Sequence, residues 1–119
     1  INELSNLLSK NKEVTGYGDI YFSPVHISSL FKLINYLCEH PIFGIYNFGS
    51  SNGISKYDFS IKISNHLNFN SALIKNVQSS DYQSILRPKD MRLDCTKLKT
   101  KIGWVLESIE NEVSKIKLR

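Results

Sequence analysis

Hydrophobic residues recur along residues 27–38 at the spacing of one helix face. They stand at i, i+3, i+4, i+7, i+10 and i+11, and they are Ile27, Leu30, Phe31, Ile34, Leu37 and Cys38. This spacing is typical of an amphipathic α-helix. His40 followed by Pro41 ends the pattern, because the residue before a proline avoids helical backbone. The pattern therefore predicts a helix over residues 27–38.

Shorter patterns predict the other elements. A helix ends near residues 10–11, and extended pieces follow at residues 14–18 and 20–22. Residues 44–49 (Gly-Ile-Tyr-Asn-Phe-Gly) carry no charge and predict a strand that is buried on both faces. Ser55, with Asp58 three residues later, predicts a helix start. We further expect strands at residues 72–77 and 91–94, a helix over residues 95–102 that Asp94 caps and Gly103 ends, and a last helix from Ser108.

The predicted order of elements is α-β-β-α-β-α-β-β-α-α, which indicates the α/β fold class. A strand without polar alternation needs covering on both sides, and this chain has few helices to do so. The first residue is Ile1 and not Met, and the chain opens inside a helical pattern. We therefore expect residues 1–119 to be one region of a larger protein whose N-terminal part is absent.

Composition and charge narrow the classes of function. The 119 residues are 41% hydrophobic and 22% charged, as in ordinary globular domains. A net charge of +4 is mildly basic, but no nucleic-acid-binding motif accompanies it, so nucleic acid is not an expected partner. The same mild positive field suits a phosphorylated small molecule. No apolar run approaches the roughly 20 residues of a membrane span, and no signal peptide opens the chain, so we expect no membrane association.

The two cysteines, Cys38 and Cys95, lie far apart and form no CxxC pair. This arrangement favours neither a zinc site nor a disulfide framework. Cys38 falls on the apolar stripe of residues 27–38, so we expect a buried thiol there. Reduced cysteines fit the cytoplasm, which is the predicted location.

Side chains that carry chemistry do not form a catalytic set. The histidines, His26, His40 and His66, fall in separate elements, and only His26 stands at a strand–helix junction, where ligands often lie. The sequence contains no Gly-rich dinucleotide loop and no metal-ligand spacing. None of the six tyrosines is followed four residues later by a lysine that could acidify its phenol. We therefore expect neither a catalytic residue nor a metal site in this chain.

Three segments, in order, resemble one enzyme family. They are residues 22–30 (Phe-Ser-Pro-Val-His-Ile-Ser-Ser-Leu), residues 44–49 followed by 54–59 (Ile-Ser-Lys-Tyr-Asp-Phe), and residues 87–98 (Arg-Pro-Lys-Asp-Met-Arg-Leu-Asp-Cys-Thr-Lys-Leu) followed by Ile102-Gly-Trp. Together they resemble the C-terminal part of the extended short-chain dehydrogenase/reductase superfamily, and most closely its dTDP-4-dehydrorhamnose reductases. The family's usual Thr, Asp and Asn are replaced by Val25, by Ser28 or Ser29, and by Asp90.

The resemblance implies that substrate and cofactor are bound by different parts of the protein. This chain would be the substrate-binding lobe of a sugar-nucleotide reductase, and residues 44–49 would be a late strand of its Rossmann sheet. The N-terminal Rossmann half would bind NAD(P) and carry a Ser/Thr–Tyr–Lys set, and hydride would pass to a 4-keto nucleotide sugar. The implied partners are therefore a nucleotide sugar and that Rossmann half, and a homodimer is a further expectation.

Within such a lobe, five residues are the candidates for substrate binding: Arg87, Arg92, Tyr21, Pro24 and His26. Arg87 precedes Pro88 and offers a planar fork of N–H donors for a diphosphate, and Arg92 is the second candidate for that contact. The turn from Tyr21 to Pro24, together with His26, would line the sugar side of the cleft.

Two alternatives stay open within the same superfamily. One is a nucleotide-sugar epimerase or dehydratase, since the residues that separate these chemistries lie in the absent half. The other is a non-catalytic regulatory subunit, because one branch of the family regulates methionine adenosyltransferase. An intact Tyr-x-x-x-Lys motif in the preceding sequence would favour an enzyme.

Overall fold

Strands and helices separate into two units in the computed structural model, which describes residues 2–81 and 88–117. The sheet unit comprises Ile1–Phe22, Ile54–Met91 and Lys117–Arg119. The helical unit comprises Ser23–Gly53 and Arg92–Ile116. Among the described residues, no helix is both long enough and apolar enough to cross a membrane.

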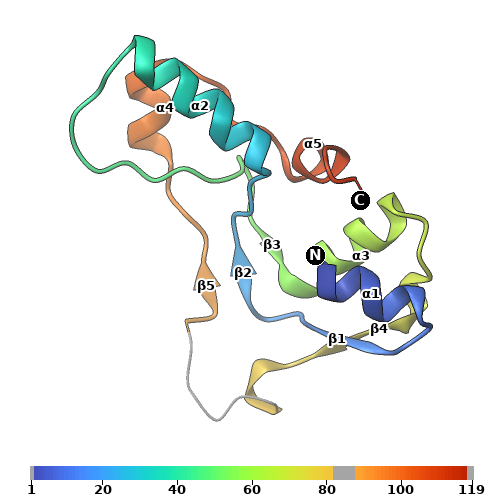
Figure 1. Ribbon diagram of the computed structural model, residues 1–119. Coiled ribbons are helices and arrows are strands. Elements are labelled where there is room, and N and C mark those ends of the chain that lie inside the picture. The colour runs from blue at the N-terminus through green and yellow to red at the C-terminus, as the bar shows by residue number, and fades with distance from the viewer. Residues whose placement is uncertain (1, 82–87, 118–119) are drawn as a thin grey trace. The chain divides into compact units, whose positions relative to one another are not determined.

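The strands of the sheet unit form two small sheets (Figure 1). β1 (Val14–Tyr17) pairs in parallel with β4 (Ile74–Val77), so that Val14 lies opposite Ile74. β2 (Tyr21–Phe22) lies between β3 (Ile54–Ser55), to which it is antiparallel, and β5 (Asp90–Met91), to which it is parallel. β2 pairs with β3 on one side and with β5 on the other. Residues that are distant in sequence therefore lie next to Phe22, where the chain leaves the sheet unit.

Helices cover this sheet unit. α1 (Asn2–Ser9) and α3 (Lys56–His66) pack against β1, and short 3₁₀ turns, η1 (Ser71–Leu73) and η2 (Ser79–Asp81), precede and follow β4. Ser55 caps α3, since its Oγ accepts from the Asp58 N–H at 3.0 Å. The buried hydrophobic side chains are Leu8, Ile20, Ile54, Ile63 and Ile74. The predicted helix start at Ser55 is therefore confirmed.

Three helices make the helical unit: α2 (Ile27–Glu39), α4 (Thr96–Ile102) and α5 (Ile109–Ser114). α2 and α4 lie side by side in Figure 1, and their buried contact consists of Leu33, Leu98 and Ile102. Gly103 ends α4 with φ of 69°, a left-handed conformation in which a Cβ atom is strained. Ser108 caps α5 by accepting from the Asn111 N–H.

The segment at residues 44–49 corrects one sequence prediction. No strand forms there in the described chain, and the third strand of the order is instead β3. A strand needs a hydrogen-bonding neighbour, and no described segment pairs with these residues. The α/β class and the order of helices and strands are nevertheless as predicted.

The exposed face of α2 is a second correction. The helix forms as predicted, but Ile27, Phe31 and Ile34 of its predicted stripe are 58%, 59% and 44% exposed. Cys38 is exposed as well, whereas we expected a buried thiol. The physical reason is that α2 packs on α4 through the neighbouring face that carries Leu33 and Leu37, so Ile27, Phe31 and Ile34 stay exposed.

Candidate functional site

The loop from Ser23 to His26 leads into α2, and contacts within the helical unit hold both of its ends. At the first end, Ser23 Oγ accepts a hydrogen bond from the Leu93 N–H at 3.2 Å. Gly49 lies so close that a Cβ atom there would sit 2.8 Å from the Ser23 Cβ. Only a glycine permits this approach without displacement of the loop.

His26 forms the second end of the loop and caps α2. Its backbone N–H donates to Glu112 Oε2 at 2.6 Å, and its ring Nδ1 accepts from the Ser28 N–H at 3.2 Å. The same nitrogen lies 2.8 Å from Ser28 Oγ. The structure therefore gives His26 a role at the helix start, which is the structural alternative to a role in catalysis.

Glu112 is a buried carboxylate that the sequence patterns did not single out. Its exposed fraction is 3%, and both of its oxygens accept from Ser29 Oγ, at 2.8 and 2.9 Å. Lys115 Nζ lies 3.5 Å from Glu112 and donates to Ser29 Oγ at 2.7 Å. A signal did exist: Glu112 stands at i+3 on the stripe that begins at Ile109, where an apolar residue belongs.

This cluster does not supply a nucleophile. A Ser–Lys pair can attack a carbonyl only if the lysine takes the proton of the serine hydroxyl. Here Lys115 Nζ donates to Ser29 Oγ at 2.7 Å instead of accepting from it, and it lies 3.5 and 3.9 Å from oxygens of Glu112 and Glu107. The Ser29 hydroxyl points at Glu112 instead, so the cluster binds α5 to the start of α2.

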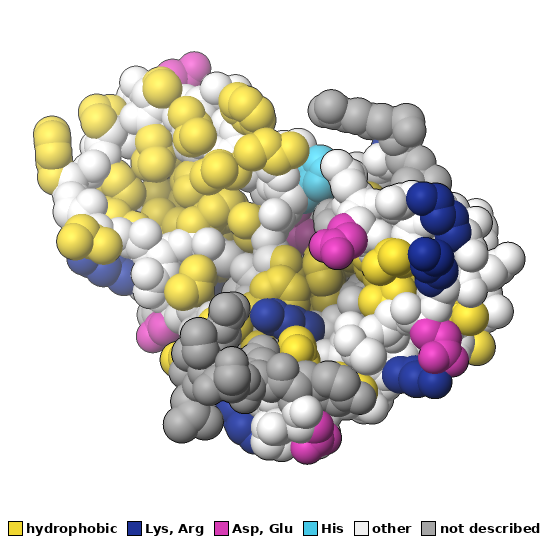
Figure 2. Space-filling model, turned by 60° about the horizontal axis from the view of Figure 1, so that its bottom comes forward, with side chains coloured by type: hydrophobic (Ala, Val, Ile, Leu, Met, Phe, Trp, Pro, Cys, Tyr) yellow, Lys and Arg dark blue, Asp and Glu magenta, His cyan; other side chains and the backbone are white. Residues whose placement is uncertain are grey.

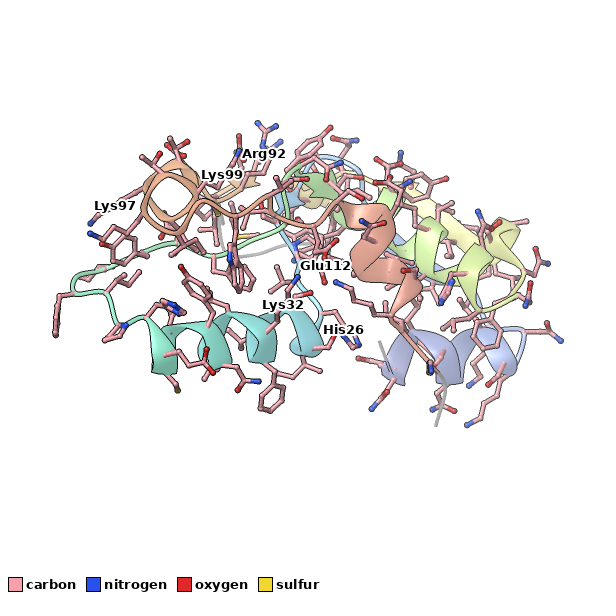
Figure 3. The ribbon with its side chains drawn as sticks, turned by 90° about the horizontal axis from the view of Figure 1, so that it is seen from above. His26, Lys32, Arg92, Lys97, Lys99 and Glu112 are labelled. Carbon is pink, nitrogen blue, oxygen red and sulfur yellow. The ribbon has the colours of Figure 1, made fainter. Side chains whose placement is uncertain are left out.

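The candidate residues are not all brought together. Pro24 and His26 share the anchored loop, whereas Arg92 lies at the start of the segment leading to α4, with its aliphatic chain against Gly53. Figure 3 shows Arg92 and His26 well apart. Tyr21 belongs to β2 of the sheet unit, where its N–H donates to the Lys89 carbonyl at 2.7 Å. The remaining candidate, Arg87, lies outside the described residues.

In the sheet unit, the carboxylate of Asp19 accepts several hydrogen bonds and links distant segments of the chain. Asp19 accepts from the Ser79 N–H at 2.9 Å and from Ser79 Oγ at 2.8 Å, and it pairs with Lys89 Nζ at 2.8 Å. The bond from Lys89, with those from Ser79, lowers the pKa of Asp19 from 3.8 to about 2. By contrast, burial raises the pKa of the Cys95 thiol, which is therefore an unreactive group.

A cavity in the sheet unit is a poor candidate for an anionic ligand. It measures about 490 Å³, and Leu4, Leu7 and Val14 line it together with the carboxylates of Glu3 and Glu13. Carboxylates repel a diphosphate, and Glu13 is already paired with Lys75 at 2.7 Å. Within residues 2–81 and 88–117, no three His, Cys, Asp or Glu side chains are placed to hold a metal ion.

Comparison with known proteins assigns the family. The model of the RmlD substrate binding domain matches residues 1–117, which is nearly the whole chain. The chain belongs to the RmlD substrate-binding domain family. It is therefore a substrate-binding domain like that of dTDP-4-dehydrorhamnose reductase, and the resemblance drawn from the three sequence segments is confirmed. No curated protein sequence matches the chain.

Solved structures agree on the fold. The dTDP-4-dehydrorhamnose reductase of Bacillus anthracis, solved with NADP, matches with a TM-score of 0.84 at 20% identity over 96% of this chain. The enzyme of the same name from Yersinia enterocolitica matches with a TM-score of 0.79 at 20% identity over 95% of it. A dTDP-glucose 4,6-dehydratase from Bacillus anthracis, solved with NAD, gives 0.72 at 15% identity over 95%. The chain spans about 40% of the length of the two reductases and 36% of the dehydratase.

Proposed function

We propose that this chain is the substrate-binding part of an NAD(P)-dependent sugar-nucleotide reductase, which reduces a 4-keto nucleotide sugar. Membership of the RmlD substrate-binding family over residues 1–117 carries the proposal. The anchored loop from Ser23 to His26 supports it, because a loop held at both ends presents its side chains to a ligand with little loss of entropy. Two free cysteines agree with the cytoplasm as the site of action.

The start of α2 does not fit the pyrophosphate of a dinucleotide. A pyrophosphate in a dinucleotide fold lies on a glycine-rich turn at a helix N-terminus. Here the N-terminus of α2, the longest helix, holds the carboxylate of Glu112, which would repel a phosphate. In the proposal, NAD(P) and the catalytic Tyr–Lys pair therefore belong to an N-terminal Rossmann half, and this chain contributes the sugar-nucleotide side.

The outer face of α2 is the surface that we assign to that half. Its members are Ile27, Phe31 and Ile34, and Figure 2 shows hydrophobic side chains gathered on one face of the helical unit, at the upper left. α2 carries apolar residues on two faces, and a helix of this kind is ordinarily buried on both. The uncharged segment at residues 44–49 supports the same assignment, because it has strand character without a strand partner.

A second copy of the chain is the other possible cover for this face. Light scattering of the intact protein and of its Phe31→Ser variant distinguishes the two. If α2 packs on the Rossmann half, the variant keeps the mass of the wild type and loses stability. If the variant instead has half the mass of the wild type and is otherwise unchanged, the face would be assigned to a homodimer.

The diphosphate contact is assigned to Arg87 and Arg92, which stays a prediction for both. Titration calorimetry of the intact protein with dTDP-, UDP- and GDP-sugars tests it. A charge-assisted hydrogen bond contributes about 1.5–3 kcal/mol, so we expect Arg87→Ala or Arg92→Ala to weaken the affinity at least about tenfold. Lys99→Ala removes an exposed cation of α4 and is the matched control, for which we expect no change. Equal affinity of all four proteins would contradict the assignment.

The same titration and a reductase assay decide between the reductase and its alternatives. An epimerase or dehydratase would bind the sugar nucleotide without net oxidation of NADPH, and a regulatory subunit would not turn it over. We place the reductase first because the matching family model is that of the RmlD substrate binding domain, and dTDP-4-dehydrorhamnose reductases are among the similar folds.

A further inference from the structure

Glu112 is buried where a hydrophobic side chain would suffice. It occupies a position on the apolar stripe of α5, next to Val113, and is 3% exposed. A buried carboxylate is unfavourable unless hydrogen bonds compensate for the lost water, and removal of one member of such a cluster leaves its partners unsatisfied. The need for a carboxylate here therefore comes from what it holds.

The groups around Glu112 come from the start of α2 and from α5 itself. The His26 N–H donates to Oε2 at 2.6 Å, Ser29 Oγ donates to the two oxygens at 2.8 and 2.9 Å, and Lys115 Nζ lies at 3.5 Å. Figure 3 shows Glu112 between α5 and the start of α2, beside His26. The carboxylate thus fixes the backbone at His26 and the first turn of α2 at the same time.

The effect on the loop follows from its two anchors. Ser23 is fixed by the Leu93 N–H and by contact with Gly49, and His26 is fixed by Glu112. Only two residues lie between these anchors, and the first is Pro24, whose ring restricts its φ. Loss of the Glu112 anchor would free one end of the loop without removal of any residue that faces a ligand.

We propose that Glu112 is a positioning residue, which holds the Ser23–His26 loop in the conformation that receives the nucleotide sugar. This role rests on the proposed function, since it needs that loop to line the sugar side of the site. Glu112 acts through the His26 N–H and the Ser29 hydroxyl, and it contacts no substrate itself.

Three variants of the intact protein test the role. Glu112→Leu removes every acceptor and suits the apolar stripe of α5, Glu112→Gln keeps the size and one acceptor oxygen, and Glu110→Gln alters an exposed residue of the same helix as the control. For the nucleotide sugar that binds the wild type, we expect Glu112→Leu to weaken the affinity about tenfold. We expect Glu112→Gln to recover most of that loss. The denaturation midpoint of Glu112→Leu should fall below those of the other proteins, because the His26 N–H and the Ser29 hydroxyl lose their acceptor.

An NMR measurement supplies a readout that does not depend on the ligand. A short hydrogen bond to a carboxylate shifts an amide proton downfield, so the His26 amide proton should move upfield in Glu112→Leu and less in Glu112→Gln. If Glu112→Leu does not fold, the position of the His26 amide proton in Glu112→Gln decides. An unmoved His26 proton together with unchanged affinity would overturn the role.

The outcomes separate this role from the proposed function. A wild-type protein that binds none of the nucleotide sugars overturns the proposed function and with it the positioning role. A wild-type protein that binds, beside a folded Glu112→Leu variant that binds equally well, overturns the positioning role alone.

Discussion

The two units differ in how completely they cover their own hydrophobic side chains. In the sheet unit, the large hydrophobic side chains that stay exposed among the described residues are Tyr21 and Met91, at 39% and 37%. In the helical unit they are Ile27, Phe31, Ile34, Phe43, Ile45, Leu93 and Val105. In the sheet unit, strand pairing and two helices cover the hydrophobic side chains. In the helical unit, one face of α2 is covered and the other is not. An exposed apolar patch of this kind marks an interaction surface, and our proposal assigns it to a Rossmann half.

The covered face of α2 should show the largest effect on stability. Leu98 packs against Leu33 at 1% exposure, so Leu98→Ala leaves a cavity and should lower the free energy of unfolding by about 2–5 kcal/mol. Urea denaturation of the chain measures the loss. A loss below about 1 kcal/mol would mean that this face is not a packed core.

The end of α4 should show an intermediate effect. Gly103 has a positive φ of 69°, and the space around its Cβ position is open, so Gly103→Ala adds backbone strain and no clash. We expect a loss of roughly 1–2 kcal/mol in the free energy of unfolding. Gly103→Asn should lose less, because asparagine tolerates the left-handed region, and equal losses would contradict the backbone explanation.

In the sheet unit, we expect stability to depend on pH through Asp19. The pKa of Asp19 is lowered from 3.8 to about 2. The ionised carboxylate therefore contributes to stability above pH 3.8, and this contribution is lost as the pH falls toward 2. Denaturation midpoints measured across this range should therefore fall more steeply for the wild type than for Asp19→Asn. Lys89→Met removes the largest cause of the lowered pKa, so its denaturation midpoint should also fall less steeply than that of the wild type. Parallel curves for all three proteins would contradict this.

The uncovered face of α2 should show the smallest effect in this chain. Phe31→Ser removes a side chain that is 59% exposed, so we expect a change within about 0.5 kcal/mol in the free energy of unfolding. In the intact protein the same substitution should be destabilising, because the face is then covered. Similar small losses in both would mean that this face has no partner there.

Sequence patterns predicted local structure well because its causes are local. The helix of residues 27–38, the Ser55 cap and the Gly103 end each depend on residues within one or two turns. The helix itself was predicted correctly, but the face expected to be buried is largely exposed, because which face is buried depends on α4, far along the chain. Residues 44–49 show the same limit, since strand character does not supply a strand partner.

The candidate site was harder to predict for the same reason. The position of His26 at a strand–helix junction pointed to the Ser23–His26 loop, but its bond to Glu112 joins residues that are 86 positions apart. Only the irregular carboxylate on the α5 stripe gave a signal in the sequence. Arg92 and His26 were grouped by family resemblance, and the structure shows them apart.

The most direct test of the central claim is the oxidation of NADPH in the presence of a 4-keto nucleotide sugar. We predict no oxidation by the 119-residue chain alone, and turnover when the polypeptide encoded upstream of Ile1 precedes it. NADPH oxidation by the isolated chain, or an active protein whose upstream sequence encodes no dinucleotide-binding half, would contradict the account.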